Sequence, residues 1–325
     1  MNEIRVQPSA ALDALCLLQK RRLDDVDWMN PPQIKEIRFW NDLLPDAPGD
    51  DCPSMSSLCL IVSAYFDGNL ETLSLDDLIS AFRTPEKIEE TVKERIRDEF
   101  RASYLFPMLE RLKNGIAETI CHYLENLKTV NYETLYRDRV LPSVQIETAR
   151  LKKVVDGYDA GRLFSRIACL KNELPVDHTD VYVSFFSYPI AFSLYREAFL
   201  SCFTNAIDFY PVIAHELMHG FASDGLIRRY REAVARDERL NACHRALIEN
   251  YRSGDEEEFV LAAEHYLCLL SGRYTKEALT EKIKAVYGGN CPTALALFER
   301  LTEEKEVPCD YDRWLLESFF PSPET

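Results

Sequence analysis

The sequence predicts a mainly α protein of the α+β class, in which an all-helical lobe at residues 1–165 precedes a lobe at residues 166–325 that adds a small sheet. Three observations predict this fold. Apolar residues recur at three- and four-residue spacing along most of the chain, which is the periodicity of amphipathic helices. β-branched and aromatic residues gather in one island, at 181–186 and 190–194. The 325 residues, 46% of them hydrophobic, suffice for two lobes.

The helices of the first lobe follow from this periodicity and from the loops that interrupt it. Proline-rich loops are expected at Pro31-Pro32 and from Pro45 to Pro53. The longest apolar stretch, near Leu58 to Phe66, is far shorter than the roughly 20 residues of a membrane-spanning helix, so no membrane-spanning segment is expected. The periodic segments are Ala10 to Arg22, Ile34 to Leu44, Leu75 to Phe82, Pro85 to Phe100 and Tyr104 to Leu127.

The second lobe contains the motif His215-Glu216-Leu217-Met218-His219. Pro211 suits the first turn of a helix, and apolar residues repeat around the motif at helical spacing, so a packed helix is predicted that ends near Ser223-Asp224-Gly225. Side chains four residues apart lie on one face of a helix, so both imidazoles can bind one metal ion while Glu216 addresses the water beside it. Such a half-site is typical of zinc hydrolases and needs a third ligand.

A carboxylate is expected as the third ligand, because Gly225 stands where the longer zinc-binding pattern has a third histidine. After Ser253-Gly254, acidic residues fill the first turn of an apolar helix. Glu258 is predicted as the ligand, since it is the last acid before the buried run. Glu257 is the fallback, and Glu264 stays open as a third choice. The alternative is that these acids only favour the helix dipole.

Three further helices are expected to close the second lobe. They are predicted at Lys276 to Tyr287, Pro292 to Arg300 and Tyr311 to Phe320.

The zinc-helix segment also resembles a known family. The run from Val212 to Phe221, with Asp224-Gly225 after it, is similar to the corresponding segment of the neprilysin family of metalloendopeptidases. Upstream, Asp180-Val181-Tyr182-Val183 and Ile190-Ala191-Phe192 match the spacing of that family's Asn-Ala-Tyr segment and the apolar strand behind it. The resemblance covers about residues 90 to 270. It implies a zincin-like catalytic lobe with a zinc ion, in which an edge strand containing Asp180, Val181 and Tyr182 holds the backbone of a peptide substrate.

Departures from the family's pattern bear on activity. Asp180-Val181 replaces Asn-Ala, which exchanges an amide for an acceptor-only carboxylate. The family has a histidine near its C-terminus that stabilises the charged intermediate, yet no histidine follows His265 here. We therefore expect a zinc-dependent metalloendopeptidase with Glu216 as the general base. One alternative is a catalytically weakened neprilysin-like protein that acts as a peptide-binding or interaction module, and another is a zinc enzyme with a substrate other than a peptide.

Charge and cysteine content bound the partners and the compartment. The net charge of −16, from 38 basic and 54 acidic side chains, repels nucleic acids and anionic membranes, so a peptide or small protein is the expected partner. The segment Met1 to Arg5 does not resemble a signal peptide, and a cytoplasmic location is expected, although the resembled family is usually found at the cell surface or secreted. The chain is shorter than that family's members, so it is either a cytosolic relative or a fragment. Ten cysteines scattered from Cys16 to Cys309 without C-x-x-C spacing are expected to be mostly reduced and buried.

Overall fold

The computed structural model describes residues 2–18, 31–44, 53–97, 99–187, 191–202, 208–251, 253–304 and 306–320. The chain divides into two compact units. Unit 1 comprises Met1–Glu3, Tyr158–Asp177 and Asp208–Thr325, and unit 2 comprises Ile4–Gly157 and His178–Ile207. These units do not follow the expected division at residue 165, because the sheet segment groups with the N-terminal helices and the helix at 160–171 groups with the C-terminal ones.

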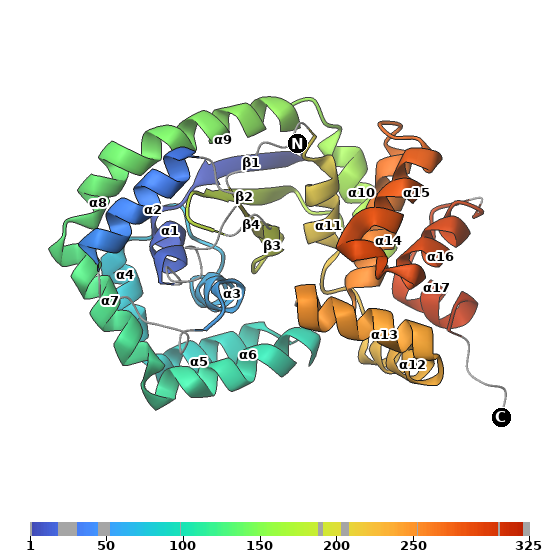
Figure 1. Ribbon diagram of the computed structural model, residues 1–325, viewed down its shortest axis with the longest axis horizontal. Helices are drawn as coiled ribbons and strands as arrows, with labels where there is room; N and C mark the ends of the chain where they lie inside the picture. Colours follow the sequence, from blue (N-terminus) through green and yellow to red (C-terminus); the bar gives the residue numbers. More distant parts are fainter. Residues whose placement is uncertain are drawn as a thin grey trace. The chain divides into compact units, whose positions relative to one another are not determined.

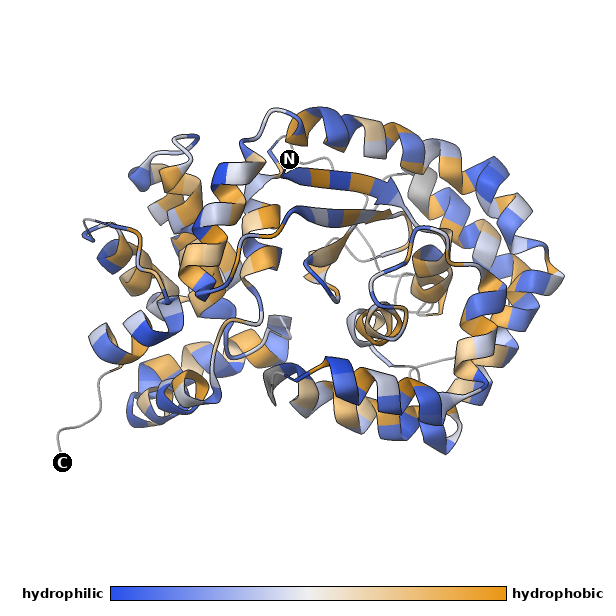
Figure 2. Cartoon of the chain, turned by 180° about the vertical axis from the view of Figure 1, so that it is seen from behind, coloured by the Kyte–Doolittle hydropathy of each residue, from blue (hydrophilic) through white to orange (hydrophobic). Residues whose placement is uncertain are grey.

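Unit 2 contains the sheet, whose strand order is β1-β2-β4-β3. Its strands are β1 (Glu3–Pro8), β2 (His178–Ser184), β3 (Ala191–Ser193) and β4 (Ala198–Cys202) (Figure 1). β4 is parallel to β2, with Phe199 opposite Val181, and antiparallel to β3. The small sheet in a mainly helical chain is confirmed. The expectation of an all-helical first lobe is wrong, because β1 alternates hydrophilic and hydrophobic residues (Figure 2) and pairs with β2.

The helices of unit 2 pack around this sheet. α1 and α9 contact β2, and α3 contacts β3. The predicted helix Tyr104 to Leu127 is interrupted, because Gly115 has a φ of 111° within the turn Leu112–Ile116. Predicted segments at 19–22, 45–52 and 188–190 lie outside the described residues. The helices are α1 (Ala10–Leu17), α2 (Pro31–Leu43), α3 (Met55–Tyr65), α4 (Leu75–Phe82), α5 (Pro85–Arg95), α6 (Glu99–Arg111), α7 (Ala117–Thr129), α8 (Tyr132–Leu135) and α9 (Leu141–Val155).

A buried carboxylate joins α1 to the end of β2. Asp13 accepts hydrogen bonds from the Ser184 hydroxyl, from the backbone N–H groups of Phe185 (2.8 Å) and Phe186 (3.2 Å), and from the Tyr136 hydroxyl (2.8 Å). Burial raises the pKa of Asp13 to about 6, although these donors lower it. The hydrogen bonds therefore stabilise the ionised form of Asp13, but burial destabilises that form by more.

Unit 1 is built around α14, which is buried along most of its length and contacts α11, α15 and α16. The three C-terminal helices lie close to their predicted positions. None of the helices in the described ranges combines the length and apolar character needed to cross a bilayer. The helices are α10 (Ala160–Lys171), α11 (Tyr210–Met218), α12 (Asp224–Arg236), α13 (Glu238–Ala246), α14 (Glu257–Leu270), α15 (Lys276–Ala285), α16 (Pro292–Leu301) and α17 (Tyr311–Ser318).

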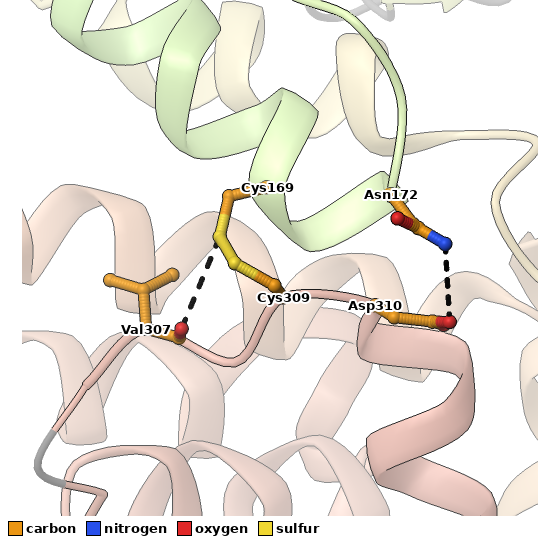
Figure 3. The surroundings of a disulfide bond; sticks show 5 residues. All are labelled: Cys169, Asn172, Val307, Cys309 and Asp310. Carbon is orange, nitrogen blue, oxygen red and sulfur yellow. Dashed lines mark hydrogen bonds between the residues drawn. A yellow bond between two sulfur atoms is a disulfide. The ribbon is translucent and has the colours of Figure 1, made fainter.

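A disulfide between Cys169 and Cys309 joins α10 to the segment that precedes α17 (Figure 3). Beside it, the Asp310 N–H donates to the Cys169 carbonyl (2.9 Å), and Asn172 Nδ2 donates to Asp310 Oδ2 (3.4 Å). Six other described cysteines are free, and five of them are buried, as expected. The expectation of mostly reduced cysteines thus holds among the described residues, and the bonded pair, separated by 140 residues, gives no spacing signal.

Candidate metal centre

The two histidines of the motif lie at the C-terminal end of α11. The centroids of the His215 and His219 rings are 4.9 Å apart, and the side chains are 17% and 19% exposed. The helix ends at Met218, with His219 as its C-cap, one turn earlier than predicted. Gly220 follows with a φ of 80°, a left-handed conformation that ends the helix. The pair therefore occupies a helix terminus that still brings both rings to one place.

The other end of α11 is anchored by Asp208. Its Oδ1 accepts from the Tyr158 hydroxyl (2.6 Å) and the Tyr210 N–H (3.0 Å), and its Oδ2 accepts from Arg273 Nε (3.0 Å) and the Tyr274 hydroxyl (2.8 Å). Partial burial raises the pKa of Asp208, but the four donors outweigh it and lower the value to about 2. This cluster fixes the start of the helix that carries the histidines.

Glu257 is the carboxylate that completes the group. One ligand atom from each of His215, His219 and Glu257 can be chosen so that all three lie within 4.8 Å of one another, and within the described ranges this is the group able to hold a metal ion. Glu257 Oε1 lies 3.5 Å from His215 Nε2. The same oxygen accepts a hydrogen bond from the Tyr287 hydroxyl at 2.6 Å. Two imidazoles and one carboxylate thus converge from α11 and the first turn of α14.

The structure gives the neighbouring Glu258 a different environment, which corrects its assignment as the third ligand. Glu258 Oε1 accepts from the Tyr230 hydroxyl (2.7 Å) and Oε2 accepts from the Ala294 N–H (3.0 Å). The side chain is buried among α12 and α16 residues, and burial raises its pKa while these donors lower it. One step along a helix turns the side chain by about 100°, so Glu257 and Glu258 face different neighbours.

Two further glutamates support the histidine rings. His215 Nδ1 is 3.0 Å from Glu264 Oε2, and His219 Nδ1 is 2.8 Å from Glu256 Oε1. Glu256 also accepts from the Gly220 N–H, at 3.1 and 3.2 Å. Because Nδ1 of each ring is engaged, Nε2 is left for a metal ion, which is the usual arrangement of metal-binding histidines. The sequence left Glu264 open as a third ligand. In the structure, Glu264 instead contacts Nδ1 of His215, the ring nitrogen that is not left for a metal ion.

These carboxylates also set the charge of the site. Burial lowers the pKa of His215, but Glu257 and Glu264 outweigh it, so the net pKa lies above the usual range. His219 behaves in the same way beside Glu256. The surrounding carboxylates thus favour positive charge at this place.

Glu216 is buried, with 6% of its surface exposed, and its Oε2 has no hydrogen-bond partner among the described residues. Burial raises the pKa of Glu216, while His219 and His215 lower it. A buried carboxylate oxygen with no partner is costly unless a cation or a water molecule satisfies it. The residue thus fits a site that receives a metal ion with its water.

The predicted substrate strand does not have a free edge. Asp180, Val181 and Tyr182 lie on β2, which is bonded to β1 on one side and to β4 on the other. Val181 and Tyr182 are buried, and Asp180 accepts a hydrogen bond from Gln7 Nε2 at 3.2 Å. A peptide backbone adds to an exposed sheet edge. The interior position of β2 therefore corrects the assignment of these residues to strand-type substrate binding.

The donor set of the site could hold a metal ion. Two imidazoles and a carboxylate are the protein ligands of many catalytic zinc sites and of non-haem iron sites. All of these residues belong to unit 1. The chain matches no protein-family model, no curated protein and no solved structure.

Proposed function

We propose that the chain is a zinc-dependent metalloendopeptidase. The observation that carries the proposal is the convergence of His215, His219 and Glu257, whose ligand atoms lie within 4.8 Å of one another, beside the buried and unpaired carboxylate oxygen of Glu216. These residues fit zinc in number and in type. Bound zinc would polarise the carbonyl of the scissile bond and lower the pKa of water.

Glu216 acts as the general base in this proposal. Its carboxylate takes a proton from the attacking water and later passes it to the leaving amine nitrogen. Glu256 and Glu264 hold the two rings in place, so little reorganisation accompanies binding.

A peptide substrate is supported by the resemblance of Val212 to Phe221 to the neprilysin segment, and by the net charge of −16, which favours neutral or basic partners. A neprilysin-like protein that binds peptides without turnover would share the metal site. The lack of a histidine after His265 favours this second candidate. The intact Glu216 favours the enzyme, because a binding module has no need for a base.

Metal analysis and peptide hydrolysis on the same preparation test the proposal. We expect about one zinc ion per chain, cleavage of a mixed peptide library, loss of cleavage with a chelator and recovery with added zinc. Glu216→Gln is the matched control, since it should keep the zinc and slow cleavage by about 10²–10⁴-fold. Protein that takes up no zinc would refute the site. Zinc uptake without cleavage would refute the enzyme and leave the binding module.

A further inference from the structure

We propose that Tyr287 is a positioning residue, whose hydroxyl fixes the carboxylate of Glu257 for metal binding. The inference rests on the proposed function and extends it to a residue in the turn after α15, which the sequence patterns did not identify. Tyr287 Oη donates to Glu257 Oε1 at 2.6 Å, in a partly buried environment. That oxygen lies 3.5 Å from His215 Nε2, so the hydrogen bond acts on the side of the carboxylate that faces the other ligands.

Tyr287 completes a set of hydrogen-bond partners, one for each ligand. His215 and His219 are each held at Nδ1 by a glutamate. Glu257 has a flexible side chain that can rotate away from the histidines, and the Tyr287 hydroxyl restricts this rotation. Each of the three ligands thus has one outer partner. Such partners orient the ligands and strengthen metal binding.

A hydroxyl is well suited to this role because it carries no charge. Lysine or arginine at this position would donate a hydrogen bond and also neutralise Glu257, in competition with the metal ion. The tyrosine hydroxyl orients the carboxylate and leaves its negative charge for the cation. A short hydrogen bond to an ionised acceptor is also stronger than one between neutral groups.

The backbone at Tyr287 adopts a conformation that is unusual for a bulky side chain. Tyr287 has φ 49° and ψ 36°, the left-handed region that is unfavourable for a bulky side chain. Gly288 (φ 64°) and Gly289 (φ 81°) continue the same turn. A side chain on Gly288 would be strained at this φ, and its Cβ atom would lie 3.0 Å from the Tyr251 hydroxyl. Strain of this kind persists where the surroundings enforce it, and it clusters at functional sites.

Tyr287→Phe tests the proposal, and Tyr251→Phe is the matched control. Tyr251 lies beside Tyr287, with ring centroids 5.1 Å apart, and is 44% exposed. We expect Tyr287→Phe to weaken zinc affinity by about 10–100-fold in competition with a chelator. It should also change the visible absorption of the cobalt-substituted protein, which reports the ligand geometry. Tyr251→Phe should leave both measurements unchanged.

A double-mutant cycle separates positioning from general structural support. In a Glu257→Ala background, Tyr287→Phe should have no further effect on zinc affinity, because its acceptor is gone. Gly288→Ala keeps the hydroxyl but disturbs the turn, so it should also weaken zinc binding, and it serves if Tyr287→Phe folds poorly. Wild-type affinity and spectrum in Tyr287→Phe, or an equal effect in both backgrounds, would overturn this inference alone. Absence of zinc binding by the wild-type protein would overturn the proposed function together with it.

Discussion

The two adjacent glutamates at the start of α14 should respond to substitution in opposite ways. Glu258→Ala removes the acceptor of two buried donors, the Tyr230 hydroxyl and the Ala294 N–H. A buried donor left unpaired costs about 1–3 kcal/mol. Two such donors cost about 2–6 kcal/mol, and because removal of the buried carboxylate offsets part of this cost, we expect the free energy of unfolding to fall by about 1–4 kcal/mol. Zinc affinity should change little.

Glu257→Ala should instead weaken zinc binding and affect stability less. It removes a ligand, so the loss of zinc affinity should exceed the roughly 10–100-fold effect of losing an outer partner. Its structural cost is one hydrogen bond, from Tyr287, worth about 0.5–1.5 kcal/mol.

Urea unfolding of the metal-free proteins measures stability without the contribution of bound metal. Chelator competition measures zinc affinity in the same variants. Glu258→Gln is a useful control, because its amide oxygen can still accept from Tyr230 and should recover part of the lost stability. If Glu258→Ala weakened zinc binding more than Glu257→Ala, the assignment of ligands from the geometry would be refuted.

Three further predictions concern carboxylates described above. Glu256→Ala should weaken zinc affinity by about 10–100-fold in chelator competition, whereas a mere dipole role would cost only about 0.3–1 kcal/mol of stability. Asp13 has a pKa raised to about 6, so its contribution to stability is complete below its unfolded pKa of 3.8 and is lost as the pH rises through about 6. Between about pH 4 and pH 7, the free energy of unfolding of Asp13→Asn should therefore rise by up to about 3 kcal/mol relative to that of wild type, as measured by urea unfolding. A difference between the two proteins that does not change with pH would contradict this. Asp208 has a pKa lowered to about 2, so its contribution is present above 3.8 and is lost as the pH falls toward about 2. Asp208→Asn should remove about 1–2 kcal/mol of stability at neutral pH, a value reduced for solvent screening, and an acid-unfolding midpoint equal to that of wild type would argue against it.

The sequence predicted the part of the site that is local in the chain. His215 and Glu216 lie in the last turn of α11 and His219 is its C-cap, so their relative positions follow largely from local helix geometry. The choice between Glu257 and Glu258 depends on the rotation of α14 about its axis, and both side chains are buried. Apolar periodicity cannot resolve a single step of rotation at the first turn of a helix that is buried on nearly all sides.

The remaining partners depend on contacts that span many residues. Glu264 and Tyr287 reach the site because α14 packs on α11 and because the turn after α15 has a left-handed backbone. No local pattern encodes either condition. The fold shows the same limit, since β1 is a six-residue strand whose pairing with β2 places the expected substrate strand in the interior of the sheet. The helical periodicity, which is local, located most of the described helices.

The Cys169–Cys309 disulfide links two segments of the chain that flank the candidate metal centre in sequence. The ring that it closes contains α11, α14 and the turn that carries Tyr287. A single proteolytic cut at Asp237, between α12 and α13, would therefore leave the histidines and Glu257 in one molecule. Their encounter would remain intramolecular, at an effective concentration on the order of millimolar. After reduction of the disulfide, the same cut would place the ligands on separate chains, and metal binding would depend on protein concentration. As long as the disulfide is intact, metal binding should therefore persist after a single cut in this part of the chain.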